Sequence, residues 1–339
     1  PHFVFETAYD AHGRVASFTY PTGLGYRNVY ENGYLTQVQK KDDNALYWKA
    51  ISRDAEGRVT REELGNGVTT DRTYKPASGF IDTILAGTLN GSVLTASVQN
   101  DVYGFDFLGN LTSRYQYATG SSTDEQYTYD ALNRLTAVFN NGVSPKTVKY
   151  DEIGNIVARS DVGAYSYTGC GGAHRVCNIT GPFTSGSYGY DANGNMVSAG
   201  NGRTLTWASF NLPASITAAG VTEAFLYSPE YERVRRVATD GSSTVYINPR
   251  IDLGGTFEKN RKADGSSEFV HHLYAGSQVV GSVTTASALV LNATLWQTRL
   301  ETAPTTANNP TGIKLLPTTS DPHALITWSA TPSPNDPVP

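Results

Sequence analysis

Hydrophobic and polar residues alternate in short runs along most of the first 285 residues of the chain. The stretches YTYD from Tyr127, LTAVFN from Leu135 and TVKYD from Thr147 show this alternation. A period of two is typical of a β-strand that packs on one face and meets water on the other. The pattern therefore predicts many short strands rather than helices.

A short turn motif, D-x-x-G, separates many of these runs. In such a turn the aspartate side chain accepts a hydrogen bond from the backbone N–H two residues on, which favours a type I turn. The fourth residue then takes a left-handed conformation and forms a bulge, so glycine is best there and asparagine is next. The motif residues are Asp10 and Gly13, Asp54 and Gly57, Asp106 and Gly109, Asp130 and Asn133, Asp151 and Gly154, and Asp191 and Gly194. Because an aspartate opens every copy of the same turn, we interpret all six as structural rather than catalytic.

The motif recurs with a period of twenty-odd residues. Asp106, Asp130 and Asp151 are 24 and 21 residues apart, and the remaining gaps are about twice as long. The long gaps and the sequence beyond them hold degenerate copies, at Tyr30, Tyr74, Tyr167 and Tyr227. A fixed period of this length is the mark of a repeat architecture.

A second turn is marked by Asn-Gly at 66–67, 141–142 and 201–202. Asn-Gly between alternating residues favours a two-residue hairpin turn in which both residues have positive φ. The predicted repeat is therefore strand, D-x-x-G turn, strand, Asn-Gly turn. The chain is expected to be all-β, built of tandem hairpins.

Tyrosines occur in pairs two residues apart, at 127 and 129, 165 and 167, and 188 and 190. Such pairs lie on one face of a strand and could stack either on a sugar or on the next hairpin. We favour packing, because aromatic cross-strand pairs normally stabilise a sheet. Trp207 is likewise expected in the core.

Composition narrows the range of functions. The chain has 33 Gly and 21 Tyr but one Met, and 17% of its residues are charged. A net charge of −5 and the absence of a long basic patch argue against nucleic acid as a partner. The late apolar stretch from Val279 is broken by Ser, Thr and Asn, so no membrane span is predicted. Since the chain opens at Pro1 without an initiator Met or a signal peptide, we expect it to be a piece of a longer chain.

Two cysteines, Cys170 and Cys177, bracket the sequence GGAHRV. Two free, packed thiols are the favoured interpretation, while a disulfide stays open for an exported protein. With His174 they offer three ligands, where a structural zinc site usually needs four, so no metal is predicted. His271 and His272 point to opposite faces of a strand and form a poor chelating pair. We find no cofactor motif and no nucleophile with its base.

The recurring pattern Y-D-x-x-G-[RN]-[LIV] resembles the YD repeat of the Rhs (rearrangement hot spot) family. The resemblance covers residues 1 to about 283 and is strongest in YSYTGCGGAHRVCNIT, in YGYDANGNMVSAGNGRTLTWASFNLPASI and in the block from YERVRRV onward. It implies a curved or spiral antiparallel sheet that forms part of a shell around a C-terminal toxin. Relatives include bacterial type VI effectors, components of insecticidal toxin complexes, wall-associated proteins and animal teneurins. The predicted domains are a repeat region, 1–285, and a Thr/Pro/Ala-rich tail, 286–339, which is divergent or disordered.

In that family, a core after the repeats carries Y-x-x-D-H-L-G-S and closely spaced D-P-x-G elements, whose aspartates cleave the chain. No DHLGS follows here, and the glycine is missing after Asp321-Pro322 and after Asp336-Pro337. A paired-carboxylate protease needs two aspartates that share a proton, and nothing in the tail indicates such a pair. Autoproteolysis is therefore the least favoured function.

We predict a non-catalytic shell segment of a secreted or cell-surface bacterial protein that encloses and delivers a toxin. Its expected partner is the enclosed C-terminal toxin domain or another chain of a secretion or toxin complex. The alternative is an adhesion or carbohydrate-binding module with glycans as partners. A cavity lined by the inward strand faces would favour the first, and exposed aromatic rows would favour the second.

Overall fold

The computed structural model describes residues 3–118, 121–182, 185–247 and 257–286. Asp321, Asp336 and the tail beyond Ala286 lie outside the described residues. The chain divides into two units, Pro1–Thr285 and Ala286–Pro339, and the description that follows concerns the first.

The described residues form strands joined by turns, without a helix. The first ladder contains β1 (Glu6–Tyr9), β2 (Val15–Thr19), β3 (Gly25–Glu31), β4 (Tyr34–Lys40), β5 (Leu46–Arg53), β6 (Val59–Leu64), β7 (Val68–Tyr74), β8 (Ile81–Asn90), β9 (Val93–Phe105), β10 (Leu111–Ala118), β11 (Ser121–Tyr129), β12 (Leu135–Asn140), β13 (Lys146–Tyr150), β14 (Ile156–Arg159), β15 (Gly163–Ser166), β16 (Asn178–Thr180) and β17 (Gly186–Ser187). The second contains β18 (Gly189–Tyr190), β19 (Met196–Ser198), β20 (Thr204–Trp207), β21 (Pro213–Ala218), β22 (Val221–Tyr227), β23 (Arg233–Ala238), β24 (Ser243–Ile247), β25 (Phe257–Arg261), β26 (Ser267–Ala275) and β27 (Gln278–Ala286).

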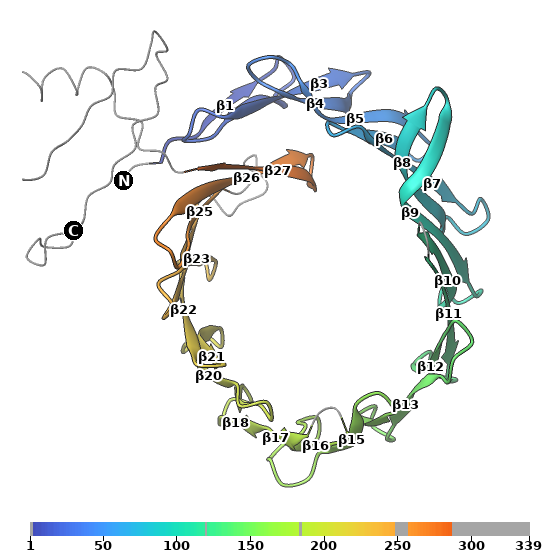
Figure 1. The fold of residues 1–339 in the computed structure, drawn as a ribbon, viewed down its shortest axis with the longest axis vertical. Coiled ribbons are helices and arrows are strands. Elements are labelled where there is room, and N and C mark those ends of the chain that lie inside the picture. Colours follow the sequence, from blue (N-terminus) through green and yellow to red (C-terminus); the bar gives the residue numbers. More distant parts are fainter. Residues whose placement is uncertain (1–2, 119–120, 183–184, 248–256, 287–339) are drawn as a thin grey trace, which may run out of the picture. The chain divides into compact units, whose positions relative to one another are not determined.

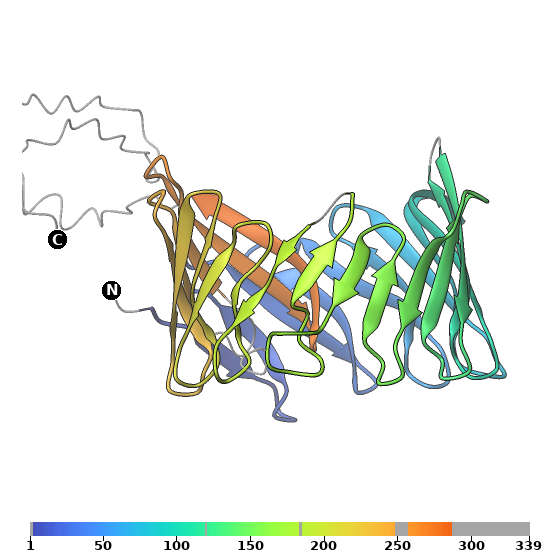
Figure 2. The same ribbon diagram turned by 90° about the horizontal axis from the view of Figure 1, so that it is seen from below.

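Each strand pairs with its sequence neighbour, from β1 to β17 and again from β18 to β27. The pairs with a resolved register are all antiparallel, as the hairpin pattern requires. The strands follow one another round a ring (Figure 1), and from the side they run between two rows of turns (Figure 2). The prediction of an all-β fold made of tandem antiparallel hairpins is confirmed.

Because strands and turns alternate strictly, the two kinds of predicted turn fall on opposite rims of the sheet. All six D-x-x-G turns connect strands such as β1 to β2 and β11 to β12, and so they share one rim. Most side chains of this single-layered sheet are only half-buried, since one layer has no second layer to cover it.

The largest hydrophobic core lies where the two ends of the repeat region overlap. In Figure 1, β26 lies on the inner side of β3 and β4, and β26 contacts β4. We call this contact the seam. Its residues are Phe18, Tyr20, Tyr26, Val38 and Trp48 from β2–β5 and the adjoining turn, and Phe257, His271 and Leu273 from β25 and β26, each no more than 2% exposed. Packing between elements more than 200 residues apart therefore closes the ring.

Candidate functional site

The repeated turn is the feature that the sequence emphasises most, and its geometry is the same in every copy. In the first turn, Asp10 Oδ1 accepts hydrogen bonds from the backbone N–H groups of His12 and Arg14, at 2.8 and 3.0 Å. Gly13 N–H donates to the Asp10 carbonyl at 3.0 Å, and Asp10 N–H donates to the Arg14 carbonyl at 2.9 Å. One carboxylate thus satisfies the orphan donors of a type I turn followed by a bulge.

The fourth residue of each turn has positive φ. Asn133 has φ of 59°, and the five glycines at this position range from 75° at Gly13 to 91° at Gly154. The register also shifts between Thr128 and Tyr129, just before the turn. This register shift is a second irregularity beside the bulge at the fourth residue. It recurs at all six D-x-x-G turns, and it was not predicted from the sequence.

The fifth residue of the motif holds the other carboxylate oxygen. Its side chain is an arginine or an asparagine and donates to Oδ2 of the aspartate at 2.7–3.0 Å in all six turns. The pairs are Arg14–Asp10, Arg58–Asp54 and Arg134–Asp130, and Asn110–Asp106, Asn155–Asp151 and Asn195–Asp191. The [RN] of the sequence pattern is therefore part of the turn.

The aromatic residue before the aspartate joins its turn to the preceding unit. Tyr129 Oη donates to the Leu111 carbonyl at 2.8 Å, and Tyr150 Oη donates to the Leu135 carbonyl at 2.9 Å. Each acceptor follows the turn of the previous unit, next to the register shift that interrupts the strand ladder. Tyr167, Tyr190 and Tyr227 make the same bond to Ile156, Val176 and Pro213, and Trp207 Nε1 makes it to Met196. Trp207 is thus half-buried and part of this series, and the expectation that it lies in the core is wrong.

In the turns whose fifth residue is an arginine, this arginine also contacts the next unit. The guanidinium of Arg14 lies 4.1 Å from the ring centroid of Tyr30, and that of Arg58 lies 3.8 Å from the ring of Tyr74. Arg134 stands over Tyr150 in the same way, at 4.6 Å. At Tyr30 and Tyr74, cation–π contact with the preceding unit gives the degenerate copy a reason to keep tyrosine while it loses aspartate. An arginine followed 16 residues later by a tyrosine was the signal in the sequence.

The six carboxylates do not act together. Hydrogen bonds from the Arg14 backbone and side chain and from His12 lower the pKa of Asp10 to about 2. The Asn110 side chain is the main cause of the lowered pKa of Asp106. The other four aspartates also have lowered pKa values; burial opposes the shift at Asp54 and Asp151, but the hydrogen bonds outweigh it. Each carboxylate is bonded within its own turn, an arrangement that orders backbone and leaves no aspartate poised to move a proton.

Cys170 and Cys177 are joined by a disulfide, with their Cα atoms 5.5 Å apart, so the favoured interpretation of two free thiols is wrong. Their loop stands in the place of a D-x-x-G turn between β15 and β16. Asn155 Nδ2 donates to the Ala173 carbonyl at 2.9 Å, and Arg175 lies over the Tyr190 ring. The enlarged loop lacks the aspartate, and the disulfide closes its ends instead.

The Asn-Gly turns are of two kinds. Asn141 and Gly142 both have positive φ, at 49° and 67°, as a two-residue turn requires. At 66–67 and 201–202 only the glycine has positive φ, so the prediction is wrong there. Gly67 N–H donates to the Leu64 carbonyl, and Gly67 is the fourth residue of a turn like D-x-x-G. The asparagine occupies the third position and accepts from the backbone two residues on.

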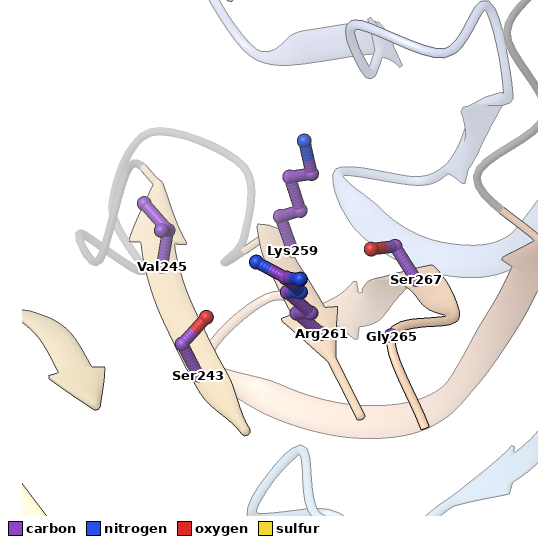
Figure 3. Close-up of a pocket in the computed structure, with 6 residues that line it drawn as sticks. All are labelled: Ser243, Val245, Lys259, Arg261, Gly265 and Ser267. Carbon is purple, nitrogen blue, oxygen red and sulfur yellow. The ribbon is translucent and has the colours of Figure 1, made fainter. Parts of the chain in front are cut away.

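A hollow of about 380 Å³ lies on β24–β26 (Figure 3). Lys259 and Arg261 line it together with Ser243, Val245, Gly265 and Ser267. Within the described residues, no cluster of histidine, cysteine and acidic side chains is suited to a metal ion. That part of the chain also has no helix of the length and hydrophobicity needed to cross a bilayer.

Comparisons with known proteins agree with this geometry. Residues 92–220 match the family model "Teneurin YD-shell". No curated protein matches the chain. The crystal structure of TcdB2-TccC3-TEV matches 84% of this chain with a TM-score of 0.64 and 16% identity. The Photorhabdus luminescens Tc holotoxin pore with the TccC3-D651A mutation matches 81% with a TM-score of 0.60 and 17% identity. The chain spans 16% of the length of each of these solved chains.

The turns and the linked units form a YD-repeat sheet, and its fold is similar to that of these solved chains. The match to the YD-shell model over residues 92–220 and the similar fold agree with the resemblance of the sequence to the Rhs/YD-repeat family.

Proposed function

We propose that this chain is a non-catalytic wall segment of a secreted Rhs-type protein that encloses and delivers a C-terminal toxin. The observation that carries the proposal is the seam, where β25 and β26 pack against β2–β5. A sheet that meets itself can separate an inside from an outside, and it hides most of the edges at which strands aggregate. The mechanism is steric: the wall keeps an active domain away from the targets of its own host.

The linked turns support the same role. Tyrosine hydroxyls such as that of Tyr129 tie a unit to the one before it, and an arginine or an asparagine of the turn ties a unit to the one after it. Such nearest-neighbour links favour a continuous wall over a set of independent hairpins. A passive wall of this kind needs no catalytic residue, and the aspartates are engaged in their own turns.

A carbohydrate-binding role has weaker support. The hydroxyls of Tyr129, Tyr150 and Tyr190 donate to backbone carbonyls, and these side chains are half-buried. A sugar-binding platform would present its aromatic faces to solvent with free polar groups.

The test uses the complete protein to which this segment belongs. Limited proteolysis should leave its C-terminal domain intact while the ring is closed. Phe257→Arg buries a charge in the seam and should make that domain cleavable, whereas Phe107→Arg changes a side chain that is 94% exposed and should have no effect. A C-terminal domain digested as fast in the unmodified protein as in Phe257→Arg, or the absence of such a domain, would contradict the proposal.

A further inference from the structure

The seam contains one fully buried polar side chain that the turn motif does not use. His271, on β26, is 0% exposed. Its ring lies 5.0 Å from the ring of Tyr20 and 5.0 Å from the ring of Phe257. It therefore sits in the aromatic contact that joins the two ends of the ring.

Both ring nitrogens of His271 are engaged, and they bond to different parts of the seam. Nδ1 lies 2.8 Å from the Val283 carbonyl on β27. Nε2 lies 2.8 Å from Thr22 Oγ1, in the turn between β2 and β3. Because a carbonyl can only accept, Nδ1 carries the proton in the neutral ring, and Nε2 accepts from the Thr22 hydroxyl. The neutral form of His271 thus links the first strands of the ring to the last.

Protonation removes this arrangement. A proton on Nε2 turns the acceptor into a donor that faces the hydroxyl hydrogen of Thr22. It also places a positive charge among aromatic side chains and away from water. Cation–π contact with Tyr20 and Phe257 offsets only part of the cost of burying an unpaired charge.

Among the residues that the structure describes, none around His271 offers a carboxylate free to neutralise that charge. The phenols of the seam are Tyr20 and Tyr26, and Tyr274 lies three residues beyond His271 on β26. The cations on the same face of β25 are Lys259 and Arg261, and β4 contributes Lys40, which is paired with Asp43. The nearby acidic groups are occupied: Glu258 contacts His272 on the opposite face, and Glu62 is bonded to Trp48 and Arg72. Among the described residues of β27 there is no charged side chain.

We propose that His271 is a pH-sensitive lock, which holds the seam closed near neutral pH and releases it in mildly acidic surroundings. Burial lowers the pKa of His271 below its ordinary value. A group whose pKa is lowered by folding stabilises the closed form above its ordinary pKa, near 6.5 for histidine, and that contribution is lost as the pH falls below it. The seam contacts by themselves support the opening of the ring at low pH. The further step, in which an open ring releases a cargo, rests on the proposed function.

The test measures the seam directly in the 339-residue chain. Spin labels at Glu31→Cys on β3 and Gln278→Cys on β27, both at exposed positions, report the distance between the first and last strands of the ring. The native cysteines are bonded to each other, so only the introduced thiols react. The distance distribution should be short and narrow at pH 7.5 and should gain a long component at pH 5.0. A second pair, Glu31→Cys with Glu56→Cys, lies within one ladder and should not change.

Two histidine variants separate the lock from general acid effects. His271→Phe fills the aromatic site without titrating, and its seam should stay closed at pH 5.0. His272→Gln alters the neighbouring histidine, which pairs with Glu258, and should open as the unmodified chain does. If His271→Phe does not fold, the imidazole NMR signals of the His272→Gln chain supply the test, because ring protonation of His271 and opening must share one midpoint.

An unchanged distance between pH 7.5 and 5.0, equal opening in His271→Phe, or opening at a pH where His271 stays neutral would each overturn the lock. These outcomes test the opening of the ring. Whether the ring protects a C-terminal domain at neutral pH is tested separately, by the limited proteolysis described above.

Discussion

Asn110 and Asn133 join two consecutive turns, with Asn110 Nδ2 donating to Asn133 Oδ1 at 3.0 Å. The same amide group also donates to Asp106 at 2.9 Å. Asn195 repeats the arrangement with Asn211, which likewise has positive φ, at 60°. Asparagine therefore replaces glycine in the left-handed position of Asn133 where the preceding unit supplies an asparagine to bond it.

The first prediction concerns that position. Asn133→Ala loses the acceptor and keeps a Cβ at a φ of 59°, so we expect it to lower the free energy of unfolding by about 1–2 kcal/mol. Asn133→Gly loses the same acceptor but relieves the backbone, and it should change stability by less than about 0.5 kcal/mol. Urea unfolding of both variants makes the comparison, and an equal loss in the two would contradict the role of φ.

The second prediction concerns the link between units. Tyr129→Phe removes the hydroxyl that donates to the Leu111 carbonyl, and it should cost about 0.5–1.5 kcal/mol. Tyr117→Phe is the matched control, because that tyrosine is 49% exposed and its hydroxyl bonds to no described residue. Equal urea midpoints for the two variants would show that the hydroxyl bond does not stabilise the wall.

The third prediction is a loss of stability in strong acid. The pKa of Asp10 falls to about 2 on folding, and those of its five counterparts are also lowered. Carboxyls with a lowered pKa stabilise the fold above their ordinary value, near 3.9, and this contribution disappears as the pH falls towards 2. Urea midpoints between pH 5 and 2 should therefore drop.

Two variants test whether the loss of stability in acid comes from the D-x-x-G turns. Asp10→Asn should reduce the change of the urea midpoint between pH 4 and 2. The control Asp42→Asn, at an exposed position outside these turns, should leave that change as it is in the unmodified chain. The turn carboxyls lose their contribution below pH 4, whereas opening of the seam is scored between pH 7.5 and 5.0, so the two effects are measured in separate pH ranges.

The fourth prediction concerns the disulfide. The Cys170–Cys177 bond closes a short loop with a sequence separation of 7, and its reduction should cost about 2–3 kcal/mol on the chain-entropy model. Thermal unfolding with and without a thiol reductant measures the effect. The double variant Cys170→Ser/Cys177→Ser should be equally destabilised and should not respond to reductant. A reductant response in that double variant would point to another cause.

Local chemistry allowed much of this fold to be predicted. The motif aspartate forms its hydrogen bonds within its own turn, so a short local sequence such as Asp130–Arg134 specifies the turn geometry. Alternation and turn spacing likewise set strand lengths and antiparallel pairing. The Asn-Gly turns at 66–67 and 201–202 show where prediction from local sequence ends. Gly67 fits either the second or the fourth place of a tight turn, and only the strand register decides between them.

What remained for the tertiary structure to decide were contacts between residues far apart in the chain. Thr22 and His271 are 249 residues apart, and nothing in either local sequence indicates that they meet. The curvature accumulated over the intervening strands brings them together, and a small change of twist in each unit would separate them. The turns and hairpins are therefore properties of the sequence, while the closed seam, and with it any function that needs an inside, is a property of the assembled sheet.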